Sequence, residues 1–208
     1  MKVAVITEWH PFDVVNFQKL FRSYEDVEAY PQAWDIFAQD PGRDGYDALV
    51  FYNMSFPAPA EGDARRRYLE DEFGTTGQGI VLLHHAILSY ETWPFWDAVS
   101  GTTQRRFSYH REQELRCRVA DGGHPITRGI DDFTVVDESY AMAEPAADNT
   151  VLLTTDHPRS VRAIAWTRTF RNSRVFCYQS GHDDRTWSDP SFREVLRRGI
   201  HWSAGRLA

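Results

Sequence analysis

Short, mostly apolar runs separated by stretches with helical spacing are the feature that most constrains how this chain folds. Val3–Thr7, Tyr46–Tyr52 and Ile80–Leu83 each predict a strand. Between them, apolar residues recur at helical spacing after Val14, and again from Tyr68 until a glycine-rich stretch ends the helix. Strands that are apolar on both sides, alternating with helices, predict a mostly parallel sheet with helices on both faces.

The second half of the chain has a different pattern. Polar and apolar residues alternate over Glu114–Ala120, as they do in a strand with one solvent-exposed face. Further strands are expected at 133–136, 151–155, 161–166 and 174–178, and a closing helix at 190–202. The chain has 208 residues and contains no linker or repeat. We therefore expect a single domain spanning 1–208.

Charge and hydropathy exclude several classes of partner. The net charge is -7, whereas a nucleic-acid-binding surface must be basic to neutralise phosphates. No apolar run approaches the roughly 20 residues of a membrane helix. The sequence enters a strand directly at its start, without the apolar core of a signal peptide. We expect a cytoplasmic protein with no nucleic-acid and no membrane partner.

The two cysteines do not form a metal or redox motif. Cys117 and Cys177 each lie in an apolar, strand-like segment, and neither belongs to a CxxC pair. Both are therefore expected to be buried, inert thiols.

Polar and histidine-bearing segments follow the predicted parallel strands. "TEWHPFD" with His10 follows the first strand, "YNMSFP" the second, His84 and His85 the third, and "QSGHDDRTW" with His182 the last. Ligands of open α/β sheets bind at the carboxyl ends of the strands, so these loops are expected to share one rim. Structural roles stay open as well: a buried imidazole at His84, a helix cap at His85 and a turn at His10.

Two adjacent acids, Asp137 and Glu138, follow an apolar run in "VVDESYAM". Burying them without partners is costly, which favours pairing with a histidine, an arginine such as Arg128, or a metal. We expect them on a loop that covers the rim; the alternative is a loop cap at the surface.

Four ordered segments resemble the ThuA-like proteins, which are named for trehalose utilisation. They are "GQGIVLLHHAILSYETWPFWDAVSG", "DGGHPITRGIDDFTVVDESY", "VLLTTD" and "AIAWTRTFRNSRVFCYQSGHDDRTWSDPSFREVLRRGIHWSAG". The resemblance covers about residues 77–205. It implies an α/β fold with a doubly wound, mostly parallel sheet flanked by helices. Class I glutamine amidotransferases and flavodoxin-like proteins have similar folds.

The resemblance also shows a missing group. A class I glutamine amidotransferase has a cysteine nucleophile at the turn after the strand that here ends at Leu83, and this chain has His84 there. Thiol-based glutamine hydrolysis is therefore excluded. The amidotransferase His-x-Glu pair has a counterpart in His182-Asp183-Asp184.

We assign roles on this basis. His84 is the central acid–base or ligand group, His182 its partner, Glu138 the carboxylate, and Asp184 the group that orients His182. We expect the side chains of His84, His182 and Glu138 within about 10 Å of one another. A divalent metal bound by His84 and His182 stays open, because the spacing is not a metal signature. The residues expected to contact substrate are His10, His85, Tyr140, Trp187 and Asp183.

The resemblance implies an enzyme that cleaves or rearranges trehalose, a related disaccharide or a keto-sugar. Aromatic residues near the histidines suit a small-molecule sugar, and they are Trp9, Tyr52, Trp93, Tyr140 and Trp187. Two alternatives remain: a non-catalytic carbohydrate-binding or regulatory module, and a metal-dependent hydrolase of another small substrate. Self-association into a homo-oligomer is also expected, from the aromatic-rich second half.

Overall fold

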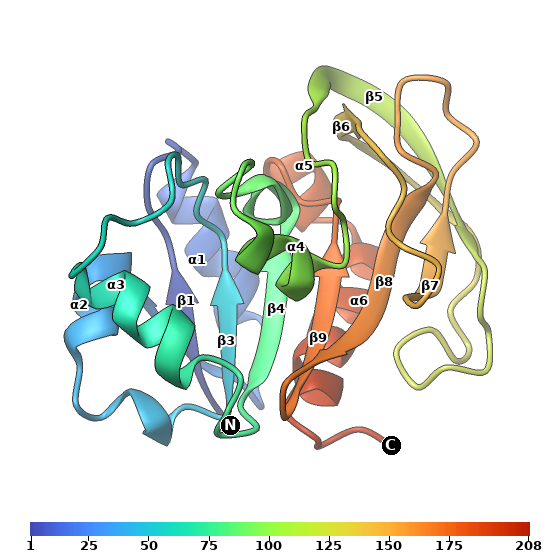
Figure 1. Ribbon diagram of the computed structural model, residues 1–208. Coiled ribbons are helices and arrows are strands. Elements are labelled where there is room, and N and C mark those ends of the chain that lie inside the picture. The colour runs from blue at the N-terminus through green and yellow to red at the C-terminus, as the bar shows by residue number, and fades with distance from the viewer.

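Nine strands form one sheet in the computed structural model, which describes residues 1–208 (Figure 1). The strand order across the sheet is β2-β1-β3-β4-β9-β8-β7-β5-β6. The strands are β1 (Lys2–Ile6), β2 (Glu28–Gln32), β3 (Ala48–Phe51), β4 (Gly79–Leu83), β5 (Ser108–Val119), β6 (Phe133–Ala141), β7 (Thr150–Thr154), β8 (Ala163–Phe170) and β9 (Ser173–Tyr178).

The five strands β2, β1, β3, β4 and β9 run parallel to one another. Strand β4 lies inside the sheet, where Leu82 pairs with Phe51 on one side and with Cys177 on the other. This confirms the expected position of the 80–83 run. Because β1, β3, β4 and β9 are parallel, their carboxyl ends share one edge of the sheet, at the top of Figure 1.

An antiparallel extension continues the sheet beyond β9. Strand β8 forms a hairpin with β9, β7 pairs with β8, and β5 joins β7 to β6. In Figure 1 the β5–β6 ribbon rises above the carboxyl edge of the parallel strands. The extension therefore carries residues of β6 towards the rim.

Helices cover both faces of the sheet. Helices α1 (Val14–Arg22) and α6 (Pro190–Ser203) cover one face, and α2 (Trp34–Gln39) and α4 (Pro94–Ser100) the other. Alternate residues of β4 enter the two separate cores, Val81 and Leu83 on the first face and Ile80 and Leu82 on the second. The remaining short helical segments are η1 (Arg43–Gly45), α3 (Ala64–Arg67), η2 (Tyr68–Glu72), η3 (His84–Leu88) and α5 (Asp184–Trp187).

One expectation about local structure is wrong. Asp137 and Glu138 lie within strand β6 and not on a covering loop. The apolar run ends at Val136, but β5 is twelve residues long and offers pairing partners beyond that point. Asp137 therefore pairs with Gln113 across the ladder, and the polar segment stays extended.

Exposed apolar side chains lie mainly in the first part of the chain. The large exposed ones are Trp9, Val14, Val15, Tyr30, Ile36, Phe56 and Tyr109. Only Tyr109 comes from the second half, so the expected apolar surface on the second half is absent. Self-association itself stays a prediction.

None of the helices combines the length and the apolar character that a membrane span needs.

Helix α6 packs so closely on β9 that glycine is required at the contact. A Cβ at Gly199 would overlap the buried ring of Phe176. We expect Gly199→Ala to lower the free energy of unfolding by about 1–3 kcal/mol, as overpacking a core does, despite the better helix propensity of alanine. Urea denaturation measures this. The matched control is Gly45→Ala, where a Cβ meets no atom within 4 Å and stability should change little. Equal midpoints for the two variants would contradict the close packing.

Candidate functional site

The polar loops that follow the parallel strands meet at one rim, as expected. The rings of His10 and His85 stack with centroids 4.4 Å apart, and His84 and His182 lie edge to face at 5.5 Å. The centroids of His10 and His182 are 6.3 Å apart. Segments after β1, β4 and β9 thus bring four imidazoles together.

His84 occupies the turn directly after β4, in a strained backbone conformation. Its φ is 54°, a left-handed value that is uncommon for residues other than glycine and often found at functional sites. The side chain is fully buried. Its Nδ1 lies 2.7 Å from the carbonyl oxygen of Gln179, which can only accept, so Nδ1 carries the proton. In the neutral ring, Nε2 is then the free base.

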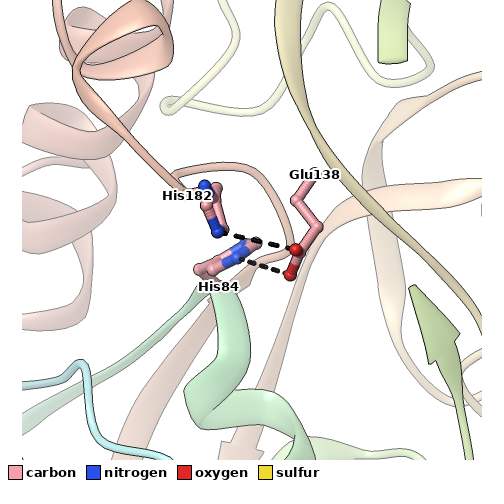
Figure 2. A group of neighbouring side chains, drawn as sticks. All are labelled: His84, Glu138 and His182. Atoms are coloured by element: carbon pink, nitrogen blue, oxygen red, sulfur yellow. Dashed lines mark ion pairs between the residues drawn. The ribbon is translucent and has the colours of Figure 1, made fainter. Parts of the chain in front are cut away.

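Strand β6 supplies two groups that face this nitrogen. The Tyr140 hydroxyl lies 2.6 Å from His84 Nε2, and it donates its proton when that nitrogen is unprotonated. Glu138 Oε1 lies 3.7 Å from the same nitrogen (Figure 2). Figure 2 shows the Glu138 carboxylate reaching towards both His84 and His182.

His182 approaches Glu138 from the loop after β9. Its Nε2 lies 3.5 Å from Glu138 Oε2, and its Nδ1 lies 3.5 Å from Asp183 Oδ2. The acid beside His182 is therefore Asp183, whereas Asp184 is exposed and begins α5. This corrects the orienting role assigned to Asp184: the chain turns into α5 after Asp183, which caps that helix.

One ligand atom from each of His84, Glu138 and His182 lies within 4.8 Å of the others. The expected grouping within about 10 Å is confirmed. The arginine beside the acids is Arg111, whose Nε lies 3.3 Å from Glu138 Oε2, and not the anticipated Arg128. Arg111 comes from β5, at the irregularity between His110 and Gln113 in its ladder with β6.

Asp137 holds the rim loop in place and does not face the cluster. Its carboxylate accepts hydrogen bonds from the backbone N–H groups of Gly181 (2.8 Å), His182 (3.0 Å) and Glu138 (2.8 Å). The Tyr52 hydroxyl donates to the Gly181 carbonyl at 3.1 Å, and Trp187 Nε1 donates to it at 2.8 Å. Trp187 was expected to contact substrate. It is instead buried, and its hydrogen bond to Gly181 supports the loop.

His85 and His10 form a second layer beside the cluster. His85 is fully buried, and its Nε2 lies 3.1 Å from the Tyr52 carbonyl oxygen. Burial and the neighbouring His84 hold the pKa of His85 well below the usual value, so the ring is neutral. Burial, His84 and His182 also lower the pKa of His10. Full burial separates His85 from solvent, whereas His10 is half-buried and reaches the rim.

The cluster keeps Glu138 ionised. Burial alone would raise the pKa of its carboxyl, but His84, His182 and Tyr140 outweigh burial and lower the pKa to about 2. Burial raises the pKa of Tyr140 well above the usual value, with the Glu138 charge acting in the same direction, so the phenol keeps its proton. The site therefore holds a carboxylate, a phenolic donor and two imidazoles.

Sequence reasoning missed Gln179, which links the two halves of the site. Its carbonyl binds His84 Nδ1, and its side-chain amide donates to the Glu138 carbonyl at 3.1 Å. The signal that could have found it was its position as the first polar residue after β9.

The cysteines behave as expected: both are buried within strands, and burial raises the pKa of each thiol, which excludes a thiolate nucleophile.

A family model described as ThuA, trehalose utilisation, matches residues 13–203. Three solved structures share the fold. A ThuA-like protein from Parabacteroides merdae is 19% identical, with a TM-score of 0.75 over 100% of this chain and 91% of that one. A second ThuA-like protein, from Bacteroides uniformis, is 20% identical, with a TM-score of 0.71 over 97% and 90%. A cytoplasmic protein from Salmonella typhimurium is 12% identical, with a TM-score of 0.69 over 98% and 99%. Comparison with curated protein sequences gives no match.

The Asp137 contacts generate a stability prediction. Asp137→Asn leaves one acceptor oxygen for the three N–H groups, so at least one buried donor loses its partner. We expect a loss of about 1–3 kcal/mol in the free energy of unfolding. Chemical denaturation measures it, with the exposed Asp184→Asn as the control. A variant as stable as the control would show that Asp137 does not hold the loop.

Proposed function

This chain belongs to the ThuA family, and we propose that it cleaves or rearranges a disaccharide or keto-sugar by acid–base chemistry at His84, Glu138 and His182. The family is described by trehalose utilisation, which supports a sugar as the substrate class. The proposal includes a cytoplasmic location, as described for the Salmonella typhimurium neighbour.

The observation that carries the proposal is the fixed tautomer of His84. Because Nδ1 donates to the Gln179 carbonyl, the basic Nε2 points at Tyr140 and Glu138. An imidazole whose free nitrogen is oriented in this way acts as a general base. The Glu138 carboxylate, 3.7 Å away, stabilises the imidazolium that forms. The Tyr140 hydroxyl, 2.6 Å from His84 Nε2, is the neighbouring proton donor.

His182 supplies the second proton-transfer group. Its side chain is 20% exposed, against 1% for His84, so it lies nearer to solvent and to an incoming substrate. Glu138 contacts both imidazoles, one with each carboxylate oxygen. In the proposed reaction, one imidazole removes a proton from a sugar hydroxyl or from a carbon beside a ketone. The other then protonates the departing or rearranging oxygen.

Trp9 is proposed to bind a sugar ring in a hollow whose lining does not include His84, Glu138 or His182. It is 64% exposed and immediately precedes His10, the ring that lies near His182. A hollow of about 230 Å³ adjoins it. The hollow combines aromatic faces with charged groups, which suits the apolar face and the hydroxyls of a sugar. Its lining includes Trp9, Phe56, Pro57, Asp63, Arg65 and Tyr90.

A non-catalytic carbohydrate-binding module is the second candidate. It is favoured by the complete burial of His84, whose Nε2 already has Tyr140 as a partner. Under this alternative, sugars raise the melting temperature without being converted.

Turnover of trehalose and of its keto derivative, followed by chromatography of the products, tests the proposal. We expect His84→Asn and His182→Gln to lower the rate about 10²–10⁴-fold, the usual contribution of a general acid or base. Asparagine is chosen because it tolerates the left-handed backbone at position 84. The melting temperature should fall by only a few degrees.

His157→Gln is the control, since His157 lies in the turn after β7, outside the cluster. Conversion that is equal in all three variants would overturn the proposed chemistry. Sugar-induced melting shifts without product would support the binding module instead.

A further inference from the structure

We propose that His84, Glu138 and His182 bind one divalent transition-metal ion of the Zn²⁺ class, through one nitrogen of each imidazole and the Glu138 carboxylate. The inference rests on the same cluster as the proposed function, but metal binding is measured without any substrate.

The spacing of the cluster fits a metal better than it fits direct hydrogen bonding. The two imidazole–carboxylate separations are 3.7 and 3.5 Å. A charge-assisted hydrogen bond would bring such atoms to about 2.7–2.9 Å. Ligand atoms about 2.0–2.2 Å from a tetrahedral metal lie about 3.4 Å from one another. These two separations are close to that value, whereas the three ligand atoms together lie within 4.8 Å of one another, so the side chains must draw together on the ion.

The outer ring nitrogens are oriented as those of metal-binding histidines usually are. His84 Nδ1 donates to the Gln179 carbonyl, and His182 Nδ1 faces the Asp183 carboxylate at 3.5 Å. Such outer partners fix the tautomer and direct the other nitrogen to the metal. Both Nε2 atoms point at the same carboxylate, each facing a different oxygen.

Two imidazoles and one carboxylate select the metal class. Nitrogen ligands suit Zn²⁺, Fe²⁺, Co²⁺ or Ni²⁺, whereas Mg²⁺ and Ca²⁺ prefer oxygen alone. Three protein ligands leave at least one coordination position free, as in catalytic zinc sites. A carbonyl or hydroxyl oxygen of a sugar would occupy that position and be polarised there.

Tyr140 and Arg111 compete with the ion for the same atoms. The Tyr140 hydroxyl contacts His84 Nε2, and Arg111 contacts Glu138 Oε2. Metal binding therefore requires Tyr140 to release His84, after which its hydroxyl is free to donate to a group on the metal. Arg111 is exposed and leaves readily. In the metal-bound form both Nε2 lone pairs are used as ligands, so imidazole acid–base chemistry belongs to the metal-free form, and Tyr140 is the proton donor beside the ion.

Binding of Zn²⁺ and Co²⁺ to untagged protein, stripped with a chelator and dialysed, tests the inference. We expect one equivalent to bind and four-coordinate Co²⁺ to give its visible absorption bands. His84→Asn, His182→Gln and Glu138→Gln should each weaken binding more than about 100-fold, beyond the 10–100-fold that loss of an outer partner costs. Tyr140→Phe should keep the site, because it removes a competitor and not a ligand.

The matched controls are His157→Gln and the exposed Glu114→Gln, which should bind as the unchanged protein does. No Co²⁺ band, or binding that the three ligand variants leave unaltered, would overturn the metal site. Since the spectrum is recorded on the unchanged protein, a variant that misfolds does not decide the result. Metal binding without sugar conversion would refute only the proposed function, and conversion by metal-free protein would refute only a catalytic need for the ion.

Discussion

The hydrogen bonds of the Asp137 carboxylate are the constraint on which the site depends. This single side chain, buried in β6, accepts the N–H groups of Gly181, His182 and its own neighbour Glu138. It thereby ties the antiparallel extension to the loop that follows the parallel strand β9. Without those bonds, three backbone donors near the rim would lack partners, which is costly in a buried environment. Fixing the loop also fixes the distance between His182 and Glu138.

The parallel half of the fold follows from sequence patterns, since strands such as Ile80–Leu83 are apolar on both faces. The same logic places His84 and His182 at one edge, because parallel strands end there. The contribution of β6 could not be derived in this way. Its polar segment pairs with the long strand β5. The pattern of apolar residues does not reveal this pairing, because the segment itself is polar. Consequently Glu138 was expected near the histidines, but on a loop, and the structural role of Asp137 was missed.

Sequence patterns also cannot predict roles that depend on the rotamer of one side chain or on the residue at which a helix begins. Asp183 and Asp184 are adjacent and chemically identical, and only the start of α5 decides which of them faces His182. Gln179 acts through its backbone carbonyl, an atom that every residue type has. Trp187 looks like a substrate-binding aromatic, yet its indole N–H is used to hold the Gly181 carbonyl. In each case a long-range contact decides the role.

The division of the site between two regions of the sheet has a consequence for folding. The parallel strands carry the imidazoles, and β6 carries the carboxylate and the phenol. The contacts that join them span 56 residues between His84 and Tyr140, 45 between Asp137 and His182, and 41 between Glu138 and Gln179. Contacts between residues so distant along the chain require closure of long loops, so they form slowly. The reactive groups therefore meet only after both regions have docked, and a nascent or partly folded chain exposes isolated imidazoles without a working site.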